Sequence, residues 1–190
     1  MHNFLKDFKK TMVKKGIPDE IINQFDFSSK NGSSPEDTQT VINLMDKLLS
    51  KEQCLSIMEE QGCCTTGKPA KAHSDFGKKY ANKTISERIE LFDKLETHHR
   101  PPCKLNDDGT LSVFWGFVNE GDHICVCGFV NKLSQIVSKT HCGCCGGHAR
   151  KLLQKSLGIK LQLKEIVSSA VSSKGKKSCE FLFEINSEFK

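Results

Sequence analysis

Ten cysteines among 190 residues are the side chains that could carry chemistry in this sequence. A Cys-x-Cys pair, Cys125 and Cys127, is followed by the run His-Cys-Gly-Cys-Cys-Gly-Gly-His at 141–148, whose glycines would let a loop fold tightly. Two Cys-x-Cys pairs supply four sulfur ligands, and soft tetrahedral sulfur sites select zinc. The sequence therefore predicts a zinc site with the ligands Cys125, Cys127, Cys142 and Cys144.

Other residues near these pairs are substitutes in the same ligand set: His141, Cys145, His148 and Cys179. An iron–sulfur cluster also needs four thiolates and ranks behind zinc as the cofactor. A structural interpretation stands beside both, because an uncoordinated cysteine packs like a small apolar side chain. Cys179 fits that interpretation best, since it alternates with Phe181 and Phe183 on one face of a predicted strand.

A second group of cysteines lies in the amino-terminal half. Cys63 and Cys64, with His73 and Cys103, form a second metal or redox site if their loops meet, or join the carboxy-terminal cysteines across a cleft. The alternative is a surface loop with incidental thiols.

Three chemical alternatives to a metal-binding, ligand-sensing protein remain open. A cysteine at the start of a helix, with His141 or His148 as base, has the parts of a nucleophile, because a helix N-terminus lowers the pKa of a thiol. Zinc with an open position would instead activate water in a hydrolase-type enzyme. The Cys-x-Cys pairs could also oxidise to disulfides, which would make the protein a thiol redox switch.

The elements that position these residues change character near residue 105. Capping-box pairs at Ser50/Gln53 and Thr84/Glu87, and Ser34 before Pro35, predict helices in a part spanning 1–104. In 105–190 the period becomes two: segments 111–118 and 123–130 predict a hairpin, 147–157 a helix ending at Gly158, and segments from Ile159 and Cys179 two further strands. We therefore expect an α+β protein, with an N-terminal helical part packed on a cysteine-rich antiparallel ββ-α-ββ domain.

The carboxy-terminal third also resembles a known group of proteins. The pattern comprises Cys125-Val-Cys127, Cys142-Gly-Cys144 with Gly147-His148, Leu157-Gly158, Ser173-Lys-Gly175 and Cys179-Glu-Phe181. It is similar to prokaryotic proteins related to the 4-vinyl reductase domain and to L-2-amino-thiazoline-4-carboxylic acid hydrolase-like proteins. The resemblance implies a fold like that of transport-particle subunits, a cavity for a small molecule and a sensing role. It implies Cys125, Cys127, Cys142 and Cys144 as site residues, and it does not imply the hydrolase activity, since no catalytic set can be placed.

Composition limits the partners. The net charge of +5 is small and spread along the chain, which argues against a nucleic-acid partner. No stretch reaches the roughly 18 apolar residues of a membrane span, and the first ten residues lack the pattern of a secretory signal. We expect a cytoplasmic protein with a small-molecule ligand, and the sequence does not determine its oligomeric state.

Overall fold

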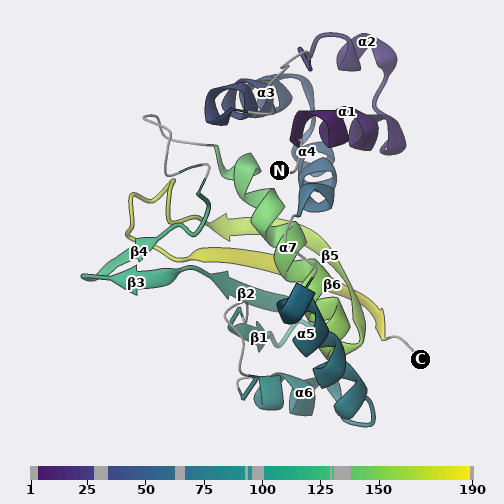
Figure 1. The fold of residues 1–190 in the computed structure, drawn as a ribbon, viewed down its shortest axis with the longest axis vertical. Helices are drawn as coiled ribbons and strands as arrows, with labels where there is room; N and C mark the ends of the chain where they lie inside the picture. The colour runs from purple at the N-terminus through teal and green to yellow at the C-terminus, as the bar shows by residue number, and fades with distance from the viewer. Residues whose placement is uncertain are drawn as a thin grey trace.

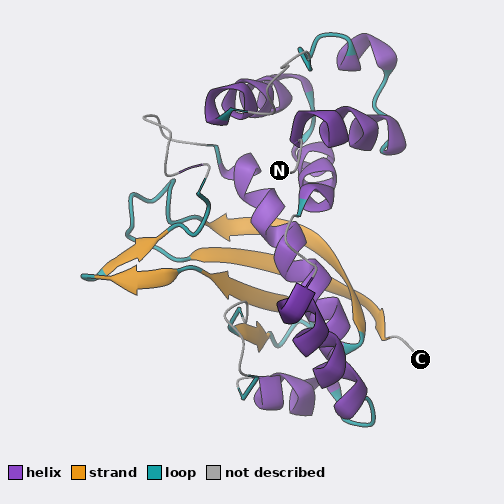
Figure 2. Ribbon diagram, viewed as in Figure 1, coloured by secondary structure: helices purple, strands orange, loops and turns teal. Residues whose placement is uncertain are grey.

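A four-stranded antiparallel sheet forms the base of the carboxy-terminal half (Figure 1). This computed structural model describes residues 4–27, 34–62, 67–92, 94–95, 101–128, 130 and 138–188. The strands lie in the order β1-β2-β6-β5, with β1 at Cys103–Leu105, β2 at Leu111–Trp115, β5 at Ile159–Ser168 and β6 at Cys179–Glu188. Together with the helices shown in Figure 2, the sheet confirms the α+β class.

The sheet has one buried face and one solvated face. Ile159, Leu161 and Leu163 of β5 are buried and alternate with exposed polar residues, as their spacing predicts. A bulge after Leu163 shifts this alternation by one residue, which returns Ile166 to the buried face.

Three helices cover the buried face. The long helix α7 (Lys139–Leu157) lies across the sheet, α5 (Gly67–Lys79) packs on α7, and α6 (Ile85–Phe92) lies beside β1 (Figure 1). Their apolar side chains and those of the sheet form one core, which includes Phe76, Phe92, Leu153 and Phe181. The domain boundary at 104/105 stays a prediction. The two hydrophobic cores divide the chain before α5, because the side chains of α5 and α6 pack in the sheet core.

The amino-terminal helices form a second core. α1 (Phe4–Lys14), α2 (Asp19–Ile22), α3 (Pro35–Leu48) and α4 (Lys51–Met58) enclose Phe8, Met12, Ile42 and Met45, which are fully buried. The predicted caps are confirmed: Ser34 with Asp37, and Ser50 with Gln53, form capping boxes at the starts of α3 and α4. A short 3-10 helix, η1 (Glu59–Gln61), follows α4 and packs against α7.

Two expectations about the elements are wrong. The segment that holds His73 is not a loop but part of α5, and Pro69 is tolerated there because it lies in the first turn, where a missing N–H costs nothing. The predicted strand at 111–118 is divided at Gly116, whose φ of 122° ends β2. β2 pairs with β1 and β6, while β3 (Phe117–Asn119) and β4 (Asp122–Ile124) form a short hairpin of their own.

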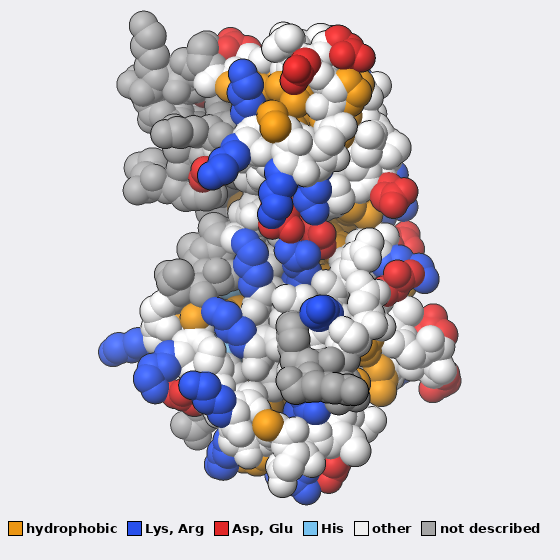
Figure 3. All heavy atoms as spheres, turned by 90° about the vertical axis from the view of Figure 1, so that its right-hand side faces the viewer, with side chains coloured by type: hydrophobic (Ala, Val, Ile, Leu, Met, Phe, Trp, Pro, Cys, Tyr) orange, Lys and Arg blue, Asp and Glu red, His pale blue; other side chains and the backbone are white. Residues whose placement is uncertain are grey.

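Charged groups are distributed over the surface. Lys and Arg side chains are numerous on the face in Figure 3, and Asp and Glu side chains lie among them and along its edges. Among the described residues, no helix combines the length and apolar character needed to cross a bilayer.

Candidate thiol–imidazole site

The site is built where the loop after β4 meets the start of α7. β4 ends at Ile124, so Cys125 and Cys127 lie in a loop and not on the regular strand that we expected. This loop geometry allows the chain to turn its thiols toward a common neighbour, which an extended strand would keep about 7 Å apart. Cys125 and Cys127 are partly exposed.

Helix α7 begins eight residues before the predicted start at Gly147. Ser138 caps it through a hydrogen bond from the Thr140 N–H, so the run 141–148 lies inside the helix and does not open it. Within a helix, residues two apart point in nearly opposite directions, whereas residues three or four apart share a face. His141, Cys142 and Cys145 therefore lie on the side of α7 that faces the sheet and the Cys125–Cys127 loop.

Cys144 points to the other side of α7. Its Sγ donates to the Gln61 carbonyl oxygen at 3.3 Å, and the side chain packs against the core of the amino-terminal helices. Helical geometry thus separates Cys144 from Cys142, and the expected four-sulfur set is not brought together.

The glycines of this run serve helix packing rather than a tight loop. A Cβ at Gly147 would overlap the carbonyl oxygen of Glu59, and one at Gly143 would lie 2.6 Å from the Cβ of Met58. Both glycines let the backbone of α7 approach α4 and η1 closely. The approach is held by Arg150, which contacts Glu59 and Glu60 at 3.1 Å each.

The central contact of the site joins its two segments. The Sγ of Cys127 lies 3.6 Å from the Nε2 of His141. The His141 side chain is 5% exposed, and its Nδ1 has no hydrogen-bond partner among the described residues. A buried ring nitrogen without a hydrogen-bond partner costs free energy.

Hydrogen bonds orient three further thiols around this pair. The Cys127 N–H donates to the Sγ of Cys125 at 3.4 Å, and the Ala170 N–H donates to the Sγ of Cys179 at 3.4 Å. The thiol of Cys142 donates to the Ser169 hydroxyl at 3.3 Å. Backbone N–H groups aimed at sulfur stabilise the negative charge of a metal-bound thiolate.

Burial controls the ionisation of these groups. It raises the pKa of Cys125 to about 11 and that of Cys142 to about 12, and it also raises the pKa of Cys145 and Cys179. The charge of Cys127 raises all four further, which shows that five sulfur atoms lie within electrostatic reach of one another. Burial lowers the pKa of His141 to about 4. At neutral pH the four thiols with a raised pKa are therefore protonated, and the His141 imidazole is neutral.

The remaining predicted residues lie elsewhere. His148 contacts the edge of Trp115, with ring centroids 5.1 Å apart. His73 is fully buried, and its Nδ1 lies 2.7 Å from the Ser156 hydroxyl, which gives it a structural role between α5 and α7. Cys103 packs against the sheet core from β1. Cys63 and Cys64 lie outside the described residues.

The arrangement does not show a preformed metal geometry. Within the described ranges, no three His, Cys, Asp or Glu side chains stand in positions that would hold a metal ion. His141 is only a substitute ligand in the sequence prediction. Its spacing of four residues from Cys145 is the signal that places both side chains on one face when the run is helical.

Comparisons with known proteins assign no family. No protein-family model matches the chain, and a search of curated proteins returns no match. Among solved structures, the chain is similar to an H-NOX protein from S. oneidensis, crystallised in the Fe(II)NO ligation state, with a TM-score of 0.38 and 11% identity. The alignment covers 98% of this chain and 99% of that chain, and at this TM-score no assignment rests on it.

Proposed function

We propose that this protein binds a thiophilic metal ion, zinc in the first place, between the loop after β4 and the first turns of α7. The observation that carries the proposal is the separation of 3.6 Å between Cys127 Sγ and His141 Nε2. Zinc bonds of about 2.3 Å to sulfur and 2.0–2.1 Å to nitrogen, at a tetrahedral angle, place two such ligands about 3.5 Å apart. This pair is already spaced for one shared ion.

Cys125 and Cys142 are the further ligands in this proposal. Cys125 lies two residues from Cys127 and receives a backbone hydrogen bond at its sulfur, while Cys142 follows His141 on α7. With Cys127 and His141 they make a Cys₃His set, in which His141 replaces the predicted ligand Cys144. The other thiols have to rotate toward the ion, because their present positions do not form a coordination shell.

A sensing or structural role fits this site better than nucleophilic catalysis. A reactive cysteine needs a lowered pKa, and burial raises the pKa of Cys125, Cys142, Cys145 and Cys179. No carboxylate is among the described groups that shift these four thiols, and none of the four is the thiol in contact with the His141 imidazole, which is that of Cys127. The partial exposure of Cys125 and Cys127 gives an ion or a small ligand a route from solvent.

The test is metal analysis of protein purified without added metal, followed by titration of the chelated protein with Co²⁺. We expect about one equivalent of zinc per chain, and thiolate-to-cobalt absorption on titration. Cys127→Ser and His141→Gln should each weaken the affinity by more than about 100-fold.

Cys144→Ser is the matched control, because Cys144 lies on the same helix but faces Gln61. It should bind metal as the unmodified chain does. The proposal fails if the purified protein and the Co²⁺ titration both show no metal, or if Cys144→Ser loses as much affinity as Cys127→Ser. If the analysis found iron and acid-labile sulfide in stoichiometric amounts, the cofactor would be an iron–sulfur cluster and not zinc.

A further inference from the structure

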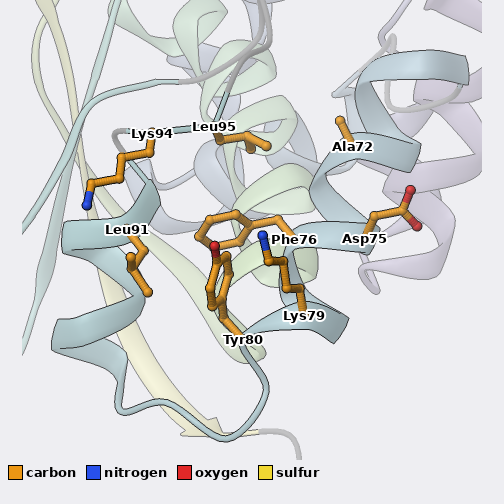
Figure 4. A pocket seen from close by; sticks show the side chains of 8 residues that line it. All are labelled: Ala72, Asp75, Phe76, Lys79, Tyr80, Leu91, Lys94 and Leu95. Carbon is orange, nitrogen blue, oxygen red and sulfur yellow. The ribbon is translucent and has the colours of Figure 1, made fainter.

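A hollow of about 420 Å³ opens between α5 and the end of α6 (Figure 4). Small-molecule sites in proteins usually measure about 300–1,000 Å³, so the hollow is large enough for a compact organic ligand. Its lining combines aromatic rings, two leucines and cationic side chains.

The floor of the hollow is rigid and apolar. The rings of Phe76 and Tyr80 lie 4.8 Å apart at 58°, and Phe76 meets the edge of fully buried Phe92 at 5.7 Å. Leu91 and Leu95 are partly buried and form the opposite wall. A flat apolar body fits against these side chains with little loss of protein conformational freedom.

One end of the hollow carries unmatched polar groups. The Nζ of Lys79 lies 5.0 Å from the centroid of the Tyr80 ring, and Figure 4 shows its ammonium group and the Tyr80 hydroxyl above the same floor. Among the described residues, that hydroxyl has no hydrogen-bond partner. Lys94 also lines the hollow, but Figure 4 shows its ammonium group pointing away from Lys79 and Tyr80.

The acidic residue of the lining does not neutralise this end. Asp75 is already paired with Lys71, with Nζ and Oδ2 2.5 Å apart, and its carboxylate points away from the hollow in Figure 4. The hollow therefore combines an apolar floor with a net positive rim and two hydrogen-bond donors.

We propose that this hollow binds small aromatic carboxylates. The aromatic body packs on Phe76 between the two leucines, while the carboxylate accepts hydrogen bonds from the Lys79 ammonium and the Tyr80 hydroxyl. This site shares no residue with the thiol–imidazole site and does not depend on the proposed metal.

The experiment uses the fact that Tyr80 is the single tyrosine of the chain. Protein labelled with 3-fluorotyrosine gives one ¹⁹F resonance, which reports from the hollow. We titrate it with 3-phenylpropionate and with the uncharged 3-phenylpropionamide, in the presence and absence of chelator. We expect a saturable shift with the carboxylate, at a Kd on the order of 1 mM, and binding of the amide weaker by about fivefold or more.

Two neighbouring lysines provide the variant and its control. Lys79→Gln should remove the preference for the carboxylate over the amide, whereas Lys78→Gln, an exposed neighbour that does not line the hollow, should keep it. Absence of a saturable shift, equal binding of acid and amide by the unmodified chain, or equal loss in both variants would overturn the proposal. None of these outcomes bears on the metal site.

Discussion

Burial sets the protonation of Cys142 and His141 before any ligand arrives. The same apolar surroundings raise the pKa of the thiol and lower that of the imidazole, because both shifts favour the uncharged form. A bound metal ion would shift the thiols from the protonated to the thiolate form, since its charge stabilises the thiolate directly. Buried residues of this kind are inert without metal and become strong ligands with it.

This argument predicts low thiol reactivity in the chelated protein. A pKa raised from 9.0 to about 11 lowers the thiolate fraction of Cys125 about 100-fold near neutral pH. Alkylation by iodoacetamide, followed residue by residue with mass spectrometry, should therefore be slower at Cys125 and Cys142 than in the urea-unfolded chain. The rates should rise about tenfold per pH unit, because thiolate is the reacting species. If either cysteine reacted faster than in the unfolded chain, an activated nucleophile would be the better interpretation.

The proposed replacement of the ligand Cys144 by His141 shows why residue types alone do not define this site. The residue types predict a thiophilic site, but the choice among His141, Cys142, Cys144 and Cys145 depends on the helical phase of the segment. A run of glycines lowers helix propensity, so the sequence favours a loop there. The packing of α7 against α4 and η1 decides which of these side chains share a face.

At the scale of elements, close packing explains why α7 contains these glycines. Gly143 and Gly147 lie one turn apart on the side that meets α4 and η1, and each faces an atom too near to admit a Cβ. The weak helix propensity of the segment is offset by the contacts that this approach allows.

The close approach of α7 to η1 predicts that Gly147→Ala strongly lowers the stability of the protein. A Cβ there overlaps the backbone of Glu59, which cannot move aside as a flexible side chain would, so we expect a loss of about 2 kcal/mol or more in the free energy of unfolding by urea. Gly128→Ala is the control, because nothing lies within 4 Å of its added Cβ and its φ is not positive. That variant should change stability by less than about 0.5 kcal/mol. Equal stability of the two variants would contradict the packing role of Gly147.

Elements with local signals could be predicted, and those fixed by distant partners could not. Ser50 and Gln53 identify the start of α4 because both halves of the capping box lie within four residues. The partners of β2 could not be found in this way. Phe181 pairs with Val113 across nearly seventy residues, and no local pattern distinguishes that pairing from a hairpin with the next segment.

At the scale of the whole molecule, α7 belongs to both cores. One side contributes Leu153 and Leu157 to the sheet core, while Cys144 meets the core of the amino-terminal helices. Glu59 fastens the junction: its carboxylate contacts Arg150 of α7 and accepts from the Leu163 N–H of β5 at 3.3 Å. Burial raises the pKa of Glu59, while the nearby Arg150 charge opposes that rise.

A shared helix predicts that metal binding stabilises the entire chain in one transition. The proposed ligands come from α7 and from the loop after β4, so a bound ion ties the helix to that loop. Because α7 packs in both cores, unfolding either core requires α7 to be released. At a free zinc concentration a hundredfold above Kd, the free energy of unfolding should increase by about 2.7 kcal/mol.

Thermal unfolding can be followed by far-UV circular dichroism, which reports on all helices, and by the fluorescence of Trp115, the single tryptophan, which lies in β2. Both midpoints should coincide and rise together on adding zinc, and Cys127→Ser should abolish the rise. If zinc raised the midpoint measured by Trp115 fluorescence but left the midpoint measured by circular dichroism unchanged, the two cores would unfold in separate transitions.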